Sequence, residues 1–132
     1  MSNNNKNNTS LEEFAFFDKK PAAFPFYEAV RCYILSEFAD VKMKVQKTQI
    51  TFSNKHGFAF VSLPQRKVEG NPKAYLLLTL GLNRKLEHPR VYVATEPYPG
   101  RWTHHFVIQS ENDIDDEIKK WIDEAYHYAK IK

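Results

Sequence analysis

The sequence predicts a two-layer α+β domain, in which N-terminal and C-terminal helices cover an antiparallel sheet of five to six strands. Three observations lead to this fold class. Helical spacing of apolar residues is confined to the two ends of the chain, the middle alternates apolar and polar residues, and no helix-length segment separates the predicted strands. Short links favour antiparallel pairing, because parallel neighbours need long crossover connections.

Length and composition fit a single domain. The chain has 132 residues, of which 42% are hydrophobic and 27% are charged, close to the globular average. Residues 1–9 are rich in asparagine and offer nothing to bury, so we expect a disordered tail before one domain over residues 10–132. One cysteine, and no apolar run long enough for a membrane span or a secretory signal, lead us to expect a cytoplasmic protein without membrane association.

Two helices are expected before the sheet. Ser10 and Glu13 have the spacing of a capping box, which begins a short helix with Leu11, Phe14 and Phe17 on its apolar side. The second helix is predicted over residues 25–38. Its apolar side chains recur at helical spacing: Phe26, Val30, Tyr33, Ile34 and Phe38.

The middle of the chain is predicted to form the sheet, as an antiparallel meander of neighbouring strands. The predicted strands are residues 41–46, 49–53, 58–63, 75–80, 90–95 and 101–109. Residues 64–73 hold two prolines, a glycine and several charges, so we expect a loop there.

The chain is expected to end in a helix that packs on the sheet. Ser110 is a suitable N-cap, and acidic residues follow it near the positive end of the helix dipole. The helix carries an apolar stripe, made of Ile114, Ile118, Trp121, Ile122 and Ala125.

Charge is unevenly distributed along the chain. The net charge is +3, but residues 42–101 hold eleven Lys or Arg against three acidic residues, which gives this stretch +8. Such asymmetry is typical of a surface that meets phosphate or another anion, including nucleic acid. The same residues can equally be solubilising charges on loops and strand edges.

Residues 96–106 concentrate polar and aromatic side chains. Two prolines flank Tyr98, so we expect a stiff loop that enters a strand. Alternation along that strand divides its side chains between two faces. One face carries Trp102, His104, Phe106 and Ile108, and the other carries Arg101, Thr103, His105, Val107 and Gln109. The apolar members mark the first face as the core side, so His104 is expected to be buried and His105 to face away.

Three chemical interpretations of this segment compete with a purely structural role. A zinc site is disfavoured, because adjacent strand residues such as His104 and His105 point to opposite faces. An acid–base enzyme would use a histidine with Glu96 or Tyr98, but no nucleophile or carboxylate pair accompanies them. An anion pocket would combine Arg101 with Lys47 and one histidine.

We therefore expect a non-catalytic binding module for an anionic ligand, either a small molecule, a protein or nucleic acid. Its candidate binding residues are Lys47, Tyr98, Arg101, Trp102, His104 and His105, with Tyr98 or Trp102 as a stacking wall. We expect no cofactor and no metal. The alternative is a small enzyme that uses His104, His105 and Glu96.

Several segments together resemble a known family: residues 47–52, 57–61, 75–82 and 97–105, followed by a helix with Trp121 and Ala125-Tyr126. In this ordered set, which extends over about residues 10–130, the chain resembles the uncharacterised bacterial and archaeal family known as domain of unknown function 5655. The resemblance implies a single α+β domain. It brings no established catalytic residues.

Overall fold

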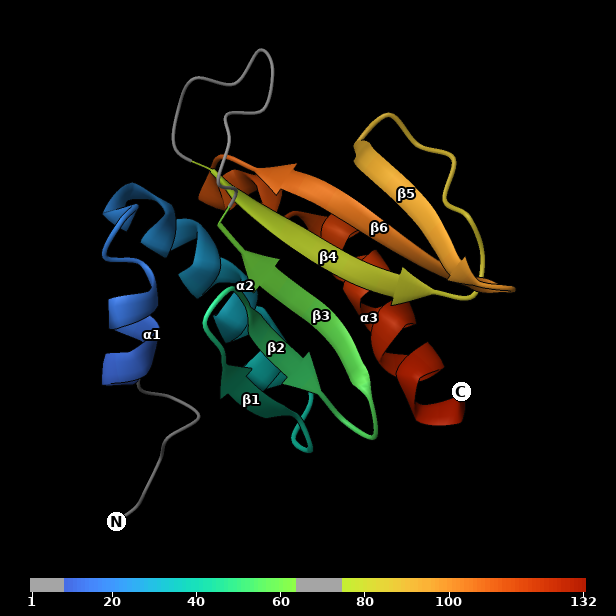
Figure 1. Cartoon of the computed structure of the whole chain (residues 1–132), viewed down its shortest axis with the longest axis horizontal. Coiled ribbons are helices and arrows are strands. Elements are labelled where there is room, and N and C mark those ends of the chain that lie inside the picture. Colours follow the sequence, from blue (N-terminus) through green and yellow to red (C-terminus); the bar gives the residue numbers. More distant parts are fainter. Residues whose placement is uncertain (1–8, 64–74) are drawn as a thin grey trace.

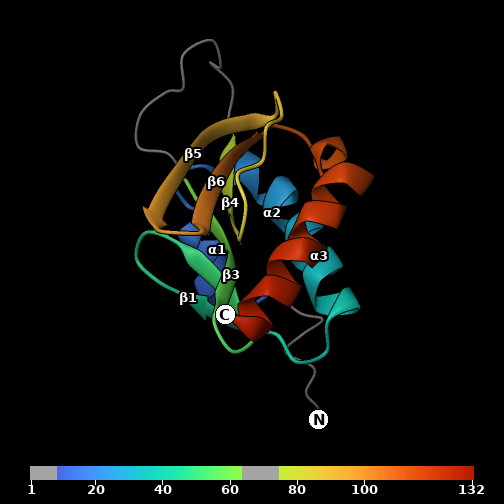
Figure 2. The same ribbon diagram turned by 90° about the vertical axis from the view of Figure 1, so that its right-hand side faces the viewer.

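The computed structural model describes residues 9–63 and 75–132 and confirms the α+β fold class. Six strands form one antiparallel sheet: β1 (Lys42–Val45), β2 (Ile50–Ser53), β3 (Gly57–Ser62), β4 (Leu76–Leu82), β5 (Val91–Tyr98) and β6 (Arg101–Ile108). The helices are α1 (Leu11–Phe16), α2 (Phe24–Glu37) and α3 (Asp116–Ile131), with 3-10 turns at Pro21–Ala23 and Glu111–Asp113. Figure 2 shows α2 and α3 on the same side of the sheet.

The strand order is β1-β2-β3-β4-β6-β5, which differs from the predicted simple meander (Figure 1). Residues 83–90 carry the chain from β4 past the neighbouring position, so β5 becomes the edge strand. After the tight β5–β6 turn the chain runs back, and β6 pairs with β4 on one side and with β5 on the other. The β5–β6 turn lies at the opposite end of the sheet from α1 (Figure 1).

The core lies between α2, α3 and the sheet face that they cover. The buried sheet residues on this face include Ile50, Phe52, Val61, Leu76, Leu78, Leu80, Phe106 and Ile108. Trp121 of α3 stacks on Phe106, with the ring centroids 5.4 Å apart and the planes at 19°. The predicted apolar stripe of the last helix therefore does dock on the sheet.

We call the side of the sheet that α2 and α3 do not cover the far face (Figure 2).

A β-bulge in β3 turns two successive residues toward the core. Phe52 pairs with Ala59 but Ser53 pairs with Gly57, so β3 holds one extra residue, Phe58, at this point. Phe58 and Ala59 are both buried as a result. Phe60, two residues after Phe58, then lies on the far face instead of beside Phe58.

The predicted capping box is present at the start of α1. The backbone N–H of Glu13 donates to Ser10 Oγ at 3.2 Å, and the Ser10 N–H donates to Glu13 Oε1 at 2.8 Å. The two residues thereby satisfy each other's backbone donors at the helix N-terminus.

Of the predicted apolar side of α1 only Phe17 is buried, which corrects the expectation from the sequence. Leu11 is 86% exposed and Phe14 is 49% exposed, whereas Glu13 is 3% exposed. The buried Glu13 carboxylate accepts hydrogen bonds from Arg31 Nε at 2.8 Å and from the Tyr27 hydroxyl, both on α2. A buried charge needs such partners, so this cluster decides which side of α1 packs on α2.

The last helix begins later than predicted. Ser110 caps the 3-10 turn, and Asp115 is the N-cap of α3, where its Oδ1 accepts the Ile118 N–H at 3.1 Å. Arg90, just before β5, donates to the same Oδ1 at 2.9 Å. The helix N-terminus is therefore tied to the edge of the sheet.

Two sequence predictions lie outside the described residues. These are the disordered tail, apart from Thr9, and the loop over residues 64–73. Thr9 itself donates a hydrogen bond from its hydroxyl to Glu28 Oε2. In the described part of the chain, no helix is both long and apolar enough to cross a membrane.

We predict that Trp121→Ala destabilises the protein by about 3 kcal/mol, because it empties a large space between α3 and the sheet. Trp121 is buried against Phe106 and meets the His88 ring edge-on at 5.0 Å. Urea unfolding of the variant measures the loss. A loss below about 1 kcal/mol would mean that α3 is not held through Trp121.

We also predict that Glu13→Gln destabilises by about 3 kcal/mol or more, because it leaves the buried Arg31 guanidinium without its carboxylate. The double variant Glu13→Gln with Arg31→Met removes both charges and should be more stable than Glu13→Gln alone. Urea unfolding compares the two. If the double variant is the less stable one, charge pairing is not what the cluster contributes.

Candidate functional site

Three of the predicted site residues line one small pocket at the β5–β6 end of the sheet. Tyr98, Arg101 and Trp102 border a space of about 190 Å³, which we call the hairpin pocket. The other described residues that line it are Gly57, Phe60, Gly81, Leu82, Pro97, Thr103, Tyr128 and Lys132. The last turn of α3 thus reaches the same place as the hairpin (Figure 1).

The hairpin turn fixes the positions of its side chains. Tyr98 pairs with Arg101 across the turn, and Gly100 has a φ of 77°, which an L side chain rarely adopts. The Gly100 N–H donates to Glu96 Oε2 at 3.0 Å. Glu96, the acid of the enzyme alternative, therefore acts in the structure as a partner of the turn backbone.

Cations and aromatic rings meet in the hairpin pocket. The Arg101 guanidinium lies 5.9 Å from the centroid of the Tyr98 ring, and the Lys132 ammonium lies 5.5 Å from that of Tyr128. Burial, and then the positive charge of Arg101, lower the pKa of Lys132 below its usual value. No Asp or Glu is among the described residues that line the pocket.

Two glycines shape the floor of the pocket in different ways. A Cβ on Gly57 would stand 2.8 Å from the Phe60 ring, so the missing side chain lets that ring lie over the strand. A Cβ on Gly81 would meet no atom within 4 Å. Gly81 therefore leaves open space in the middle of the sheet, next to Arg101 and Trp102.

His104 is a core residue, as its strand position predicts. It is fully buried, and its Nε2 accepts the backbone N–H of Leu86 at 2.9 Å, which places the proton of the neutral ring on Nδ1. Nδ1 has no hydrogen-bond partner among the described residues. Burial lowers the pKa of His104, and a backbone interaction with Leu80 only partly opposes that effect.

His105 lies on the far face, also as predicted. Its Nδ1 is 2.8 Å from the Thr79 hydroxyl on β4, and burial lowers the pKa of its ring. Neither histidine lines the hairpin pocket. Glu96 thus contacts the turn backbone, while His104 and His105 have their hydrogen-bond partners on two opposite sheet faces.

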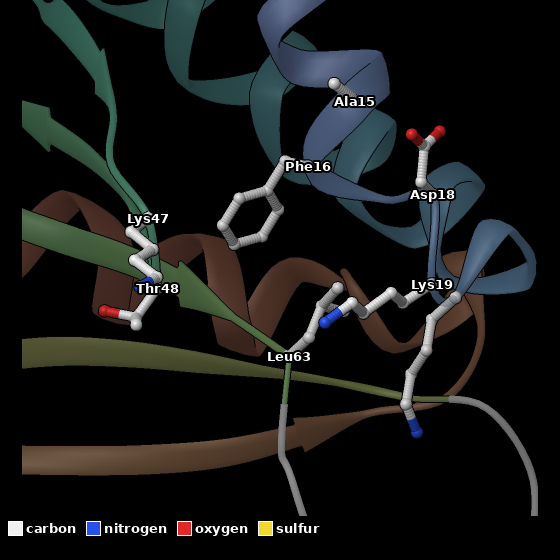
Figure 3. A pocket seen from close by; sticks show the side chains of 8 residues that line it. Ala15, Phe16, Asp18, Lys19, Lys47, Thr48 and Leu63 are labelled. Atoms are coloured by element: carbon white, nitrogen blue, oxygen red, sulfur yellow. The ribbon is translucent and has the colours of Figure 1, made fainter.

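Lys47 lines a different and larger pocket. This pocket of about 680 Å³, which we call the lysine pocket, lies between α1 and the β1–β2 turn (Figure 3). The described residues that line it are Ala15, Phe16, Asp18, Lys19, Lys20, Lys47, Thr48 and Leu63. The predicted pairing of Lys47 with Arg101 is therefore not formed, because β1–β2 and β5–β6 turn at opposite ends of the sheet.

Sequence reasoning missed Lys132, Lys19 and Lys20 as lining residues. The dipeptide Lys19-Lys20 before Pro21 was the one local signal available. Lys132 belongs to the acidic end of the chain, and nothing in the sequence brings it to Arg101. Only the docking of α3 does so.

Part of the basic middle of the chain is neutralised by acids from the last helix region. Arg84 makes two hydrogen bonds with Glu124, at 2.8 and 2.9 Å. Arg90 binds Asp115 at 2.9 Å and Glu117 at 3.3 Å. Within the part of the chain that the structure describes, no group of three or more His, Cys, Asp or Glu is placed to hold a metal ion.

We predict that acidification from about pH 7 to about pH 5.5 destabilises the protein through His104 and His105. Burial holds both pKa values below the usual 6.5, so the unfolded chain binds more protons in this range. Stability is then full above pH 6.5 and falls as the pH approaches the native pKa values, by at most about 1.4 kcal/mol per pH unit for each histidine.

Urea unfolding of His104→Gln and His105→Gln checks this prediction, because glutamine does not titrate. Each variant should show a smaller loss of stability on acidification than the wild-type protein. Slopes equal to the wild-type slope in both variants would show that burial does not hold these rings neutral.

Comparison with known proteins assigns the chain to a family. Neither a curated protein nor a solved structure matches the chain significantly. A family model described as a domain of unknown function, DUF5655, matches residues 13–129 of the 132-residue chain. That range includes all six strands and most of α3. The resemblance inferred from the sequence is thereby confirmed, and the chain belongs to the DUF5655 family.

Proposed function

We propose that this domain is a non-catalytic binding module that holds an anionic ligand in the hairpin pocket. The observation that supports the proposal is the meeting of Arg101 and Lys132 with no acidic side chain among the described lining residues. Burial, and after it the charge of Arg101, lower the pKa of Lys132. A bound anion would stabilise both charges and reverse that effect.

The side chains of the pocket suit an oxyanion such as phosphate, sulfate or carboxylate. A planar guanidinium binds such groups through two parallel hydrogen bonds, and strand pairing holds the Arg101 backbone in place. The pocket volume of about 190 Å³ suits a small anion. Tyr98, 64% exposed, offers its ring to an attached planar group.

Nucleic acid is the second candidate ligand, supported by the exposed lysines Lys42 and Lys44 on the edge strand β1. The internal ion pairs of Arg84 and Arg90 reduce the charge available for it. Binding of this kind should be weak and steeply dependent on salt. We therefore favour the small anion and treat oligonucleotide binding as an outcome of the same experiment.

We expect phosphate or sulfate, compared with chloride at equal ionic strength, to raise the Tm of the wild-type protein. The rise should be about 2–4 °C for each kcal/mol of binding free energy. Arg101→Ala should abolish the shift, and Arg101→Lys should not restore it, because an ammonium cannot form the two parallel bonds. Lys44→Ala removes an exposed charge outside the pocket and should keep the shift.

Gly81→Val tests the pocket without changing its charge. A Cβ at Gly81 meets no atom within 4 Å, so the valine should be tolerated in β4 while it fills part of the pocket. We expect a normal fold and no anion-dependent shift. Retention of the full shift in both Gly81→Val and Arg101→Ala contradicts the proposal, and so does salt-sensitive oligonucleotide binding that both variants leave intact.

A further inference from the structure

We infer that the lysine pocket is a second, independent binding site, and that its ligand is a phosphorylated small molecule with an aromatic body, of the nucleotide class. The pocket lies at the opposite end of the sheet from the hairpin pocket and shares no described lining residue with it. It is also larger, at about 680 Å³ against about 190 Å³.

The cations of this pocket come from two elements far apart in the sequence. Lys19 and Lys20 follow α1, and Lys47 belongs to the β1–β2 turn. Glu13 and its partners on α2 hold α1 beside this end of the sheet. Tertiary packing therefore places three lysines around one pocket, and a bound polyanion can interact with all of them at once.

Both sides of the pocket are held by hydrogen bonds. In the β1–β2 turn the Gln46 N–H donates to the Gln49 carbonyl at 2.8 Å, and Thr51 Oγ1 donates to Gln46 Oε1 at 2.8 Å. On the other side the Lys20 N–H donates to the Phe17 carbonyl at 3.0 Å. A ligand would thus meet backbone that is already ordered, which reduces the entropy lost on binding.

The charge of the lining favours an anion. Asp18 is the only acid among the described lining residues, and Figure 3 shows its carboxylate turned away from Lys47 and Leu63. Lys19, Lys20 and Lys47 form no salt bridge with any described residue. The Lys20 ammonium lies 5.7 Å from the centroid of the Tyr75 ring.

Apolar side chains occupy the middle of the pocket and indicate what else the ligand carries. The Phe16 ring projects between Lys47 and Leu63, and Ala15 lies above it (Figure 3). An inorganic anion would leave this surface uncovered, whereas a planar aromatic body can pack on the Phe16 ring. The Thr48 hydroxyl adds a hydrogen-bond donor beside Lys47.

Calorimetric titration of the full chain at low salt tests the inference, with ATP, inorganic tripolyphosphate and adenosine as probes. ATP should bind most tightly, tripolyphosphate more weakly and adenosine not detectably. The triple variant Lys19→Ala, Lys20→Ala, Lys47→Ala should weaken ATP binding by about tenfold or more. A matched triple variant, Lys42→Ala, Lys44→Ala, Lys55→Ala, loses the same charge outside the pocket and should bind within about twofold of wild type.

Phe16→Ala tests the contribution of the aromatic part of the ligand separately from that of the phosphates. It should weaken ATP binding and leave tripolyphosphate binding unchanged. Circular dichroism and urea unfolding verify that each variant is folded before its titration is used.

Three results overturn the inference. The first is equal loss of ATP binding in the two triple variants, which would mean unspecific attraction. The second is tripolyphosphate binding as tight as ATP binding, which would show that the site does not recognise an aromatic group. The third is ATP binding abolished by Arg101→Ala but retained without the three pocket lysines, which would place the nucleotide in the hairpin pocket and leave the proposed function standing.

Discussion

The buried contact of Glu13 with Arg31 and Tyr27 is the constraint on which the N-terminal half of the structure depends. Glu13 uses one carboxylate oxygen for the capping box and the other for the two α2 side chains. Because a carboxylate cannot be buried without such partners, α1 has one way to sit on α2. That orientation leaves Leu11 and Phe14 exposed and places the lysines after α1 in the same pocket as the β1–β2 turn.

A second constraint acts at the other end, where α3 is fixed to the sheet by packing and by charge. Trp121 stacks on Phe106, and two arginines of the basic middle bind carboxylates of α3 and its N-cap. These ion pairs neutralise two of the positive charges that the sequence suggested were available to a ligand. The charge that supports our proposals is therefore concentrated at the two ends of the sheet, at the hairpin pocket and at the lysine pocket.

Strand β6 shows how one sequence segment divides into parts with different roles. Its first residues, Arg101 and Trp102, border the hairpin pocket, whereas His104 is enclosed in the core against Leu86. His105 bonds Thr79 on the far face. Alternation along a strand sends neighbours to opposite sides, so a dense run of polar and aromatic residues need not form one site.

The sequence alone determined what local rules control. The six strands, the three main helices, the capping box at Ser10 and the opposite facing of the two histidines follow from periodicity and backbone geometry. The resemblance on the ordered segments also indicated the family. The candidate site was predicted only in part, since Tyr98, Arg101 and Trp102 do share a pocket.

Tertiary structure decided everything that depends on contacts between distant segments. The position of β6 inside β5, the bulge that turns Phe58 inward and the burial of Glu13 all depend on packing partners that lie far along the chain. The same holds for Lys132 beside Arg101 and for the pocket that Lys47 shares with Lys19. A charge pattern records how many cations a segment holds, but only the fold sets the distances between them, and electrostatic energy depends on distance.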